Sequence, residues 1–303
     1  MSARAEARIH PRSAHTTAAR VWRILRYIIM YGFLVLAAIL LLLPFVWMFS
    51  TSLKELGDVF LYPPVLVPTP MHWENYWTSM TKYPFDIFFR NTLTVVVFAV
   101  SGQIISSSLA GFAFARLRGR GRDLLFGLVL ATMMVPEQVT LIPTFIIFKS
   151  LGWIDTLLPL TVPYWFGGAA LYTFLFRQFY RTIPMDLDEA AKIDGCGYLG
   201  IYWRIIVPLS LPAVASACIF SFLARWNDFM HPLIYLHNRA NFTVALGLRL
   251  FQEMQQGGMA LGVLVEWNLL MAASLITMLP PLAIFAVAQR YFVRGVVTTG
   301  IKG

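Results

Sequence analysis

Charged side chains are scarce in this sequence. Only 13% of its 303 residues are Asp, Glu, Lys or Arg, and 58% are hydrophobic. A water-soluble domain carries about 25% charged residues. The composition therefore excludes an ordinary soluble globule and predicts an integral membrane protein.

Cysteine is also nearly absent. Cys196 and Cys218 are the only two, one in a polar loop and one in an apolar run, so neither a disulfide framework nor a metal site is supported. The chain has no Walker A motif and no Gly-Lys dipeptide at all, which excludes ATP binding by a P-loop. It also lacks motifs such as HExxH and GxSxG, and no catalytic residue is assigned.

Long apolar runs are what the sequence has instead. The first, 27–49, carries no charge over 23 residues, too long for a signal-peptide core and long enough to cross about 30 Å of hydrocarbon as a helix. We predict an all-α membrane domain over 27–290, with tails at 1–26 and 291–303. Its six transmembrane helices are expected at 27–49, 91–115, 124–148, 157–176, 207–224 and 267–289.

The basic residues are distributed unevenly between the two sides of such a domain. With the N-terminus inside, the inner segments hold six, four, four and three Lys or Arg residues, and the outer ones hold three, one and three, of 24 in all. This asymmetry places both termini in the cytoplasm and explains the net charge of +9 without nucleic acid. The expected location is a bacterial-type cytoplasmic membrane, crossed several times.

A few polar residues fall within the predicted spans. Glu137 and Gln138 follow Pro136 near the middle of the third, and Asn268 opens the sixth. An acid at bilayer depth is costly and by default faces a cavity or a partner group, so we place these three residues near a substrate pathway. The alternative for Glu137 is that it is protonated or caps the broken helix locally. His231 and His237 are expected to be interfacial or structural.

The segment 184–212 is the main polar interruption of the second half. Pro184 stands where a helix can begin, three acids occupy the first turn, and Gly195 is a stop signal. A short helix from Met185 to Asp194 is predicted, placed inside by the charge asymmetry. By itself the segment is also compatible with a capped helix that only connects two spans.

This segment resembles the EAA loop of binding-protein-dependent ABC importer permeases. The resemblance is carried by Glu189-Ala190-Ala191, Gly195 and Ile205-Ile206-Val207-Pro208 at fixed spacing. Val207 stands where the family usually has Leu, and Cys196 where it commonly has Ala; both changes are small. The resemblance implies a cytoplasmic coupling helix between spans four and five that docks on an ATPase. The residues it assigns to this coupling are Asp188, Glu189, Ala190, Ala191, Asp194 and Gly195.

Further strings are similar to the carbohydrate-uptake permeases related to the smaller maltose-transporter subunit. They are Ser52-Leu53-Lys54, Glu74-Asn75-Tyr76, Arg225-Trp226-Asn227-Asp228-Phe229 and Gln289-Arg290-Tyr291-Phe292-Val293-Arg294-Gly295. The resemblance implies a sugar or polyol as cargo and a second, similar permease in a heterodimer. It also implies two ATPase subunits that hold ATP and Mg, and an extracytoplasmic solute-binding protein.

The function expected is therefore ATP-driven import by alternating access, with hydrolysis on another polypeptide and no cofactor bound by this one. The alternative is a secondary transporter driven by an ion gradient, which should show several ionisable groups within its spans. Glu137 is nearly alone there. Which sugar is carried does not follow from the sequence.

Overall fold

The structure, a computed structural model, describes residues 17–167, 169–260 and 265–299. These residues form helices and irregular connections and contain no β-strand. The predicted tails at 1–26 and 291–303 fall partly outside the described residues. Within them, the first helix already begins at Thr17 and the last continues to Thr299, so both helices extend into the segments expected as tails.

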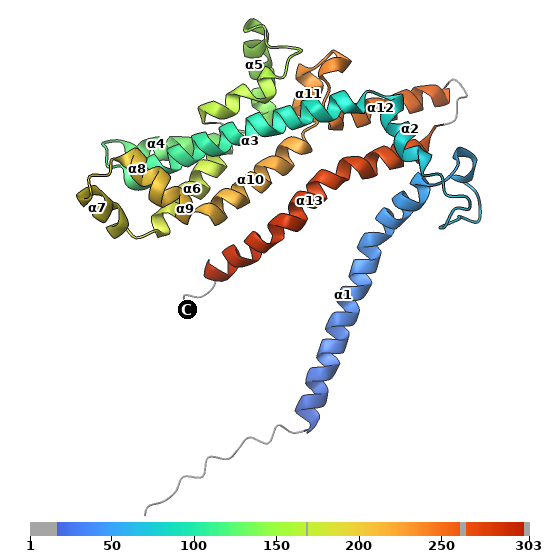
Figure 1. The fold of residues 1–303 in the computed structure, drawn as a ribbon, viewed down its shortest axis with the longest axis horizontal. Helices are drawn as coiled ribbons and strands as arrows, with labels where there is room; N and C mark the ends of the chain where they lie inside the picture. Colours follow the sequence, from blue (N-terminus) through green and yellow to red (C-terminus); the bar gives the residue numbers. More distant parts are fainter. Residues whose placement is uncertain (1–16, 168, 261–264, 300–303) are drawn as a thin grey trace, which may run out of the picture.

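Three helices in the described part of the chain are long and apolar enough to cross a membrane. They are α1 (Thr17–Ser52), α3 (Phe85–Arg116) and α13 (Trp267–Thr299). They cover the predicted spans 27–49, 91–115 and 267–289. In the most apolar part of α3, 39% of the residues are buried, against none in α1. Accordingly α3 forms the centre of the molecule, and α1 leans away from the other helices (Figure 1).

The span predicted over 124–148 is not one straight helix. It consists of α4 (Arg122–Ala131) with the 3-10 helix η2 (Thr132–Met134), and of α5 (Glu137–Ser150), which is bent by 99° from them. The break lies at Pro136, whose ring forces the preceding Val135 into an extended conformation and which has no N–H to donate. Glu137 is the first residue after the break.

The span predicted over 207–224 is also broken. A compound segment of α8 (Tyr198–Ile201), the π-helix η5 (Tyr202–Ile206) and α9 (Val207–Leu209) precedes α10 (Leu211–Trp226) at an angle of 79°. Pro212 lies in the first turn of α10, where its missing N–H interrupts the ladder from α9. α10 ends two residues later than the predicted span, at Trp226.

The helix predicted over 157–176 is wrong in its first half. That half contains only the 3-10 helices η3 (Leu158–Leu160) and η4 (Val162–Phe166), and a regular helix, α6 (Ala170–Thr182), starts later. Pro159 and Pro163 cannot extend a helical ladder, and Gly167 is left-handed with φ of 93°. The regular helical part is therefore displaced toward the C-terminus.

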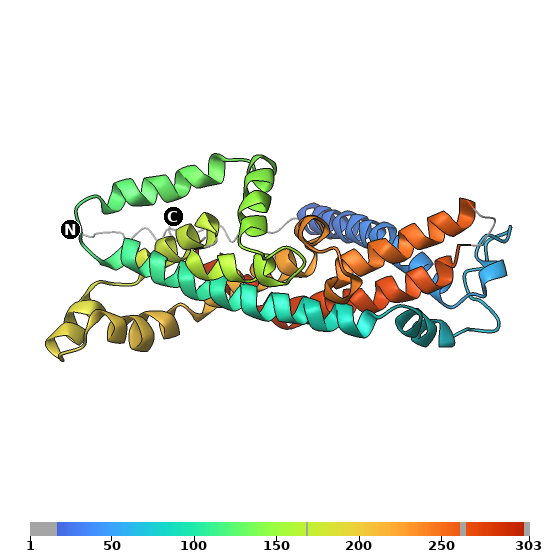
Figure 2. The same ribbon diagram turned by 90° about the horizontal axis from the view of Figure 1, so that it is seen from above.

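The remaining elements gather at the two ends of α3. η1 (Leu56–Asp58), α2 (Glu74–Lys82), α11 (Met230–Tyr235), η6 (Arg239–Asn241) and α12 (Val244–Ala260) belong to the segments between spans. Figures 1 and 2 show α7 (Asp186–Ile193) and α8 at one end of the elongated molecule and α2 at the other. One end thus carries the polar loop singled out in the sequence.

α3 packs closely on its neighbours because it carries small residues. Gly102 lies against the ring of Trp165 in η4, and the Ser106 hydroxyl donates to the Tyr164 carbonyl oxygen at 2.9 Å. A Cβ on Gly111 would come within 2.7 Å of Phe176 Cβ in α6. Small residues on α3 therefore allow η4 and α6 to approach it closely.

Candidate functional site

The polar loop folds as a short, well-terminated helix, α7. Asp186, Asp188 and Glu189 lie in its first turn. Their negative charges interact favourably with the free N–H groups at the start of a helix. At its other end Gly195 is left-handed with φ of 81°. The Cys196 N–H donates to the Ala191 carbonyl at 2.8 Å and the Gly195 N–H to the Lys192 carbonyl at 3.0 Å, the two bonds of a Schellman motif. The chain therefore leaves α7 abruptly.

α7 has one inward and one outward face. Asp188 and Ala191 are the buried residues, 2% and 8% exposed. Ala191 joins the hydrophobic cluster that contains Tyr180 and Ile201. The other residues assigned to coupling are exposed: Glu189, Ala190, Asp194 and Gly195. Two of the six residues thus hold the helix on its own protein, and four are open to a partner.

A buried ion pair fixes the inward face. Arg116 Nε, at the end of α3, lies 3.5 Å from Asp188 Oδ2, and both side chains are almost completely buried. The same guanidinium donates from Nη2 to the Ile183 carbonyl at 2.9 Å and contacts the sulfur of Met185. Because an unpaired charge is costly at such a site, α7 and the end of α3 are coupled.

Three hydroxyl groups form a second link behind α7. Ser108 Oγ of α3 lies 2.5 Å from the Tyr180 hydroxyl of α6 and 2.7 Å from the Tyr202 hydroxyl of the π-helix. Ser108 and both tyrosines are buried. The segments before and after α7 are therefore both hydrogen-bonded to the same turn of α3.

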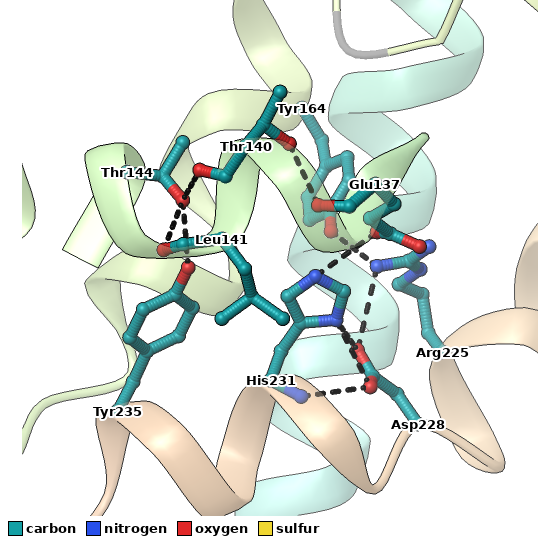
Figure 3. Close-up of polar contacts among 9 residues, drawn as sticks. All are labelled: Glu137, Thr140, Leu141, Thr144, Tyr164, Arg225, Asp228, His231 and Tyr235. Carbon is teal, nitrogen blue, oxygen red and sulfur yellow. Dashed lines mark hydrogen bonds and ion pairs between the residues drawn. The ribbon is translucent and has the colours of Figure 1, made fainter. Parts of the chain in front are cut away.

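A second polar cluster surrounds the break before α5 (Figure 3). His231 of α11 lies between two carboxylates, with Nε2 3.0 Å from Glu137 Oε1 and Nδ1 2.9 Å from Asp228 Oδ2. Arg225 Nη1 is 3.6 Å from Asp228 Oδ2, and its guanidinium lies over the Tyr164 ring and donates to its hydroxyl. The cluster connects α5, η4, α10 and α11.

The carboxylates around His231 favour the protonated form of its imidazole. The hydrogen bond with Asp228 raises the pKa of His231, against the opposing effect of burial, and the charges of Asp228 and Glu137 add to the rise. A cavity of about 170 Å³ adjoins the imidazole and is lined also by Thr140, Thr144 and Tyr235. The cavity offers hydrogen-bond donors and acceptors to a hydroxylated or charged molecule. Among the described residues, no three potential metal ligands gather closely enough to hold an ion.

The three residues placed near a pathway do not come together in one site. Glu137 belongs to the cluster with an exposed side chain, and its neighbour Gln138 is exposed as well. Asn268 is buried at the start of α13, where its Nδ2 donates to the Lys54 carbonyl at 3.2 Å, and its Oδ1 has no hydrogen-bond partner. Its observed contact is with the segment that follows α1.

Sequence reasoning did not find Arg116, Asp228 or His231 as site residues. Arg116 was one of four arginines counted only for orientation, and its partner Asp188 lies 72 positions away. Asp228 and His231 are three residues apart, a spacing that puts both on one side of a helical turn, and this was the available signal. Nothing in the sequence joins them to Glu137.

Comparison with known proteins identifies the family. The model of the family "Binding-protein-dependent transport system inner membrane component" matches residues 103–298. The chain belongs to this family. It is accordingly a multi-pass inner-membrane protein and a permease subunit of a binding-protein-dependent ABC importer, and this family consists of non-catalytic subunits. Membership favours the importer permease over the ion-gradient alternative.

Several characterised permeases are similar over most of their length. The sn-glycerol-3-phosphate transport system permease protein UgpE of Yersinia enterocolitica is 33% identical, covering 87% of this chain and 93% of its own. The osmoprotective compounds uptake permease protein GgtD of Synechocystis is 35% identical, covering 86% and 87%. The polygalacturonan/rhamnogalacturonan transport system permease protein YtcP of Bacillus subtilis is 32% identical, covering 91% and 97%.

The fold is also similar to solved structures. A chain from a bacterial ABC transporter that imports the acidic polysaccharide alginate superposes with a TM-score of 0.78 at 22% identity, covering 91% of this chain and 98% of that one. A chain from the alginate transporter in complex with its pentasaccharide-bound periplasmic protein gives a TM-score of 0.62 at 15% identity, covering 89% and 96%. These likenesses support the helical architecture.

Proposed function

We propose that this permease crosses the membrane six times with both termini in the cytoplasm. Three spans are α1, α3 and α13, and two are the bent pairs α4–α5 and α8–α10. The sixth is η4 with α6, which packs along α3. This arrangement brings the arginines of the α3–α4 loop and of the α6–α8 loop to one end, as the distribution of basic residues requires.

In this arrangement α7 is the coupling helix, docked on a separate ATPase. The observation that carries the proposal is the division of α7 into two faces. Asp188 and Ala191 attach it to the permease, whereas Glu189, Ala190 and Asp194 are exposed. Glu189 supplies a polar anchor to the ATPase, Ala190 allows close approach, and Gly195 turns the chain away.

The family and its relatives support a proposed set of partners. A second, homologous permease completes a heterodimer, for which α1 offers a long apolar surface that is exposed in this chain. Two ATPase subunits bind ATP and Mg, since this chain has no P-loop. A solute-binding protein delivers cargo on the outer side, as the periplasmic protein in the alginate complex suggests.

The cargo is a sugar or a related polyol. The relatives are named for sn-glycerol-3-phosphate, for osmoprotective compounds and for polygalacturonan/rhamnogalacturonan. The glycerol phosphate and the two polysaccharides all carry hydroxyl groups. Glu137 and His231 face the cavity beside α5 and are proposed to contact cargo hydroxyls. Gln138 follows Glu137 on α5 and is proposed to act with it. Asn268 is proposed to act from the start of α13 through its free Oδ1.

Transport proceeds by alternating access. Closure of the ATPase pair moves α7, which is tied to α3 by Asp188 and Arg116. The Ser108 hydroxyl cluster in turn ties α3 to α6, so the three helices move together. Reversing a 1:99 population requires about 5.5 kcal/mol of differential contact. The exposed face of α7 must therefore bind its partner firmly.

The decisive test separates docking from folding. Glu189→Lys reverses the charge of the proposed anchor and is expected to abolish uptake while ATP hydrolysis continues, because the ATPase no longer moves the permease. Glu55→Lys makes the same charge change at an exposed residue just after the C-terminal end of α1, far from α7. This control variant is expected to keep uptake that is driven by ATP hydrolysis. Coupled transport in Glu189→Lys, or absence of any ATPase that co-purifies with the wild-type chain, would refute the proposal.

A further inference from the structure

A basic cavity lies beside the N-terminus of α7. Its volume is about 420 Å³, and it opens between the end of α3, the start of α4 and the end of α6. It is lined by four arginines and one acid, which are Arg116, Arg122, Arg177, Arg181 and Asp123. Phe114, Ala115 and Met185 complete the lining. None of its lining residues is one of the six assigned to coupling, and none belongs to the cluster around His231.

The cavity carries more positive charge than its neighbours neutralise. Asp123 lies 3.0 Å from Arg122 and 3.8 Å from Arg177, and Arg116 is paired with Asp188. Arg181 makes no ion pair or hydrogen bond within the part of the chain that the structure describes. Two carboxylates thus face four guanidinium groups, and the cavity is suited to an anion.

Two of the four arginines are held in place by contacts with the protein. Arg116 is 5% exposed and anchored to the Ile183 carbonyl. The guanidinium of Arg177 lies over the Phe126 ring at 3.9 Å, and its Nε donates to the Phe114 carbonyl at 3.4 Å. Their donors are therefore held in place before any ligand arrives, which lowers the entropic cost of binding.

The surface next to the cavity is apolar. On α4, which also supplies Arg122, the side chains of Leu124, Leu125 and Leu128 are 70%, 56% and 57% exposed. α4 is part of a proposed membrane span, so these side chains face hydrocarbon. A ligand that fills the cavity and continues along α4 needs an anionic head and an acyl tail.

We propose that this cavity binds the phosphate headgroup of an anionic phospholipid in the cytoplasmic leaflet. Guanidinium groups bind phosphate oxygens through paired charge-assisted hydrogen bonds, and basic pockets between membrane helices take such headgroups. The inference rests on the orientation given under the proposed function. Because Arg116 lines the cavity and also pairs with Asp188, the bound headgroup lies directly beside the attachment of α7.

The test uses the full chain purified in detergent, with lipid binding measured by native mass spectrometry. Phosphatidylglycerol is expected to bind more tightly than phosphatidylcholine. Arg181→Gln removes a guanidinium that makes no ion pair or hydrogen bond with the described residues, and it is expected to weaken phosphatidylglycerol binding about fivefold. Arg118→Gln removes an exposed arginine two residues beyond Arg116 that does not line the cavity, and binding should not change.

Other ligands give distinct results. Equal binding of the two lipids, or equal affinity in the Arg181→Gln and Arg118→Gln variants, would overturn the proposal. Binding of inorganic phosphate without retention of phosphatidylglycerol would assign the cavity to a soluble anion, and cross-linking of residue 181 to an ATPase carboxylate would assign it to protein; either result overturns the lipid proposal. No ATPase or uptake is involved in the binding measurement, so its failure leaves the docking role of α7 standing.

Discussion

At the scale of single residues, Asp188 has a role that its motif does not suggest. It lies within the string that resembles the EAA loop, yet its carboxylate points inward to Arg116. Its neighbour Glu189 is exposed and available to a partner. Adjacent acids in one turn thus serve different purposes, one structural and one proposed for docking.

The first prediction concerns this buried pair. Asp188→Ala leaves Arg116 charged, buried and unpaired, so we expect a loss of about 3 kcal/mol in the stability of the α7 segment. Hydrogen exchange of the amides in α7 measures this loss. Asp186→Ala, in the same turn but exposed, is the matched control and should change exchange by about 0.5 kcal/mol or less. Equal protection of α7 in the two variants would contradict the anchoring role.

The second prediction concerns pH and His231. The pKa of His231 is raised above its ordinary value of 6.5, so its contacts with Asp228 and Glu137 stabilise the protein fully below pH 6.5. This contribution is lost as the pH rises through the folded-state pKa. We expect the melting temperature of the wild-type chain to fall over this interval more than that of His231→Gln. His237→Gln, whose backbone N–H rather than its ring bonds to Asp155, should keep the wild-type slope; a wild-type slope in His231→Gln would contradict the prediction.

At the scale of helices, the contact between α3 and α6 depends on the absence of a side chain at Gly111. An added Cβ would meet Phe176 Cβ at 2.7 Å and the Arg177 backbone nitrogen at 3.0 Å. Neither atom can move away by a rotation about a side-chain bond. The two helices would have to separate.

Gly111→Ala is therefore expected to destabilise the protein by about 1–3 kcal/mol, as overpacking does. Gly127→Ala in α4 is the control, because nothing lies within 4 Å of its added Cβ and alanine is the better helix former there by about 0.5–1 kcal/mol. Thermal unfolding in detergent compares the two. A melting temperature for Gly111→Ala at or above that of Gly127→Ala would show that the close packing is absent.

The sequence predicted several helices well, including α1, which continues through Pro44. α1, α3 and α7 form where uncharged runs, or acids followed by glycine, indicated them. Prolines were recognised as breaks, but the size of a bend depends on tertiary packing, so the 99° turn at Pro136 and the late start of α6 were not predicted. The site was predictable only in part, because Arg116–Asp188 and Glu137–His231 join positions far apart in the chain.

At the scale of the whole molecule, the arrangement of spans places two surfaces at opposite ends. α7 and the basic cavity lie at the C-terminal end of α3, and the loop around η6 is bonded to Asn91 near its N-terminal end. Asp155 stabilises that second end, since its Oδ1 accepts hydrogen bonds from the backbone N–H groups of His237 and Asn238 at 3.0 and 2.8 Å. These bonds lower the pKa of Asp155, with the Asn238 bond contributing most.

The native cysteines allow this arrangement to be tested. In a Cys218→Ser chain, Cys196 follows the end of α7 and should react with a membrane-impermeant maleimide only in inside-out vesicles. In a Cys196→Ser, Cys218→Ser chain, a cysteine introduced by Arg239→Cys should react only in right-side-out vesicles. Labelling of both sites from the same side would refute the six-span topology, and gel-shift mass tagging reads out the result.

The π-helical turn from Tyr202 to Ile206 places one extra residue in the connection between α7 and α10. The hydrogen bonds of a π-helix join residues five apart, so its turn is wider than that of an α-helix, whose bonds join residues four apart. Rewinding that surplus residue into regular form would rotate the preceding segment by about 100° and shift it by about 1.5 Å, the increments of one helical residue. The connection between α7 and α10 thus contains a step of one residue, which can be taken up or released at η5 while α10 remains helical.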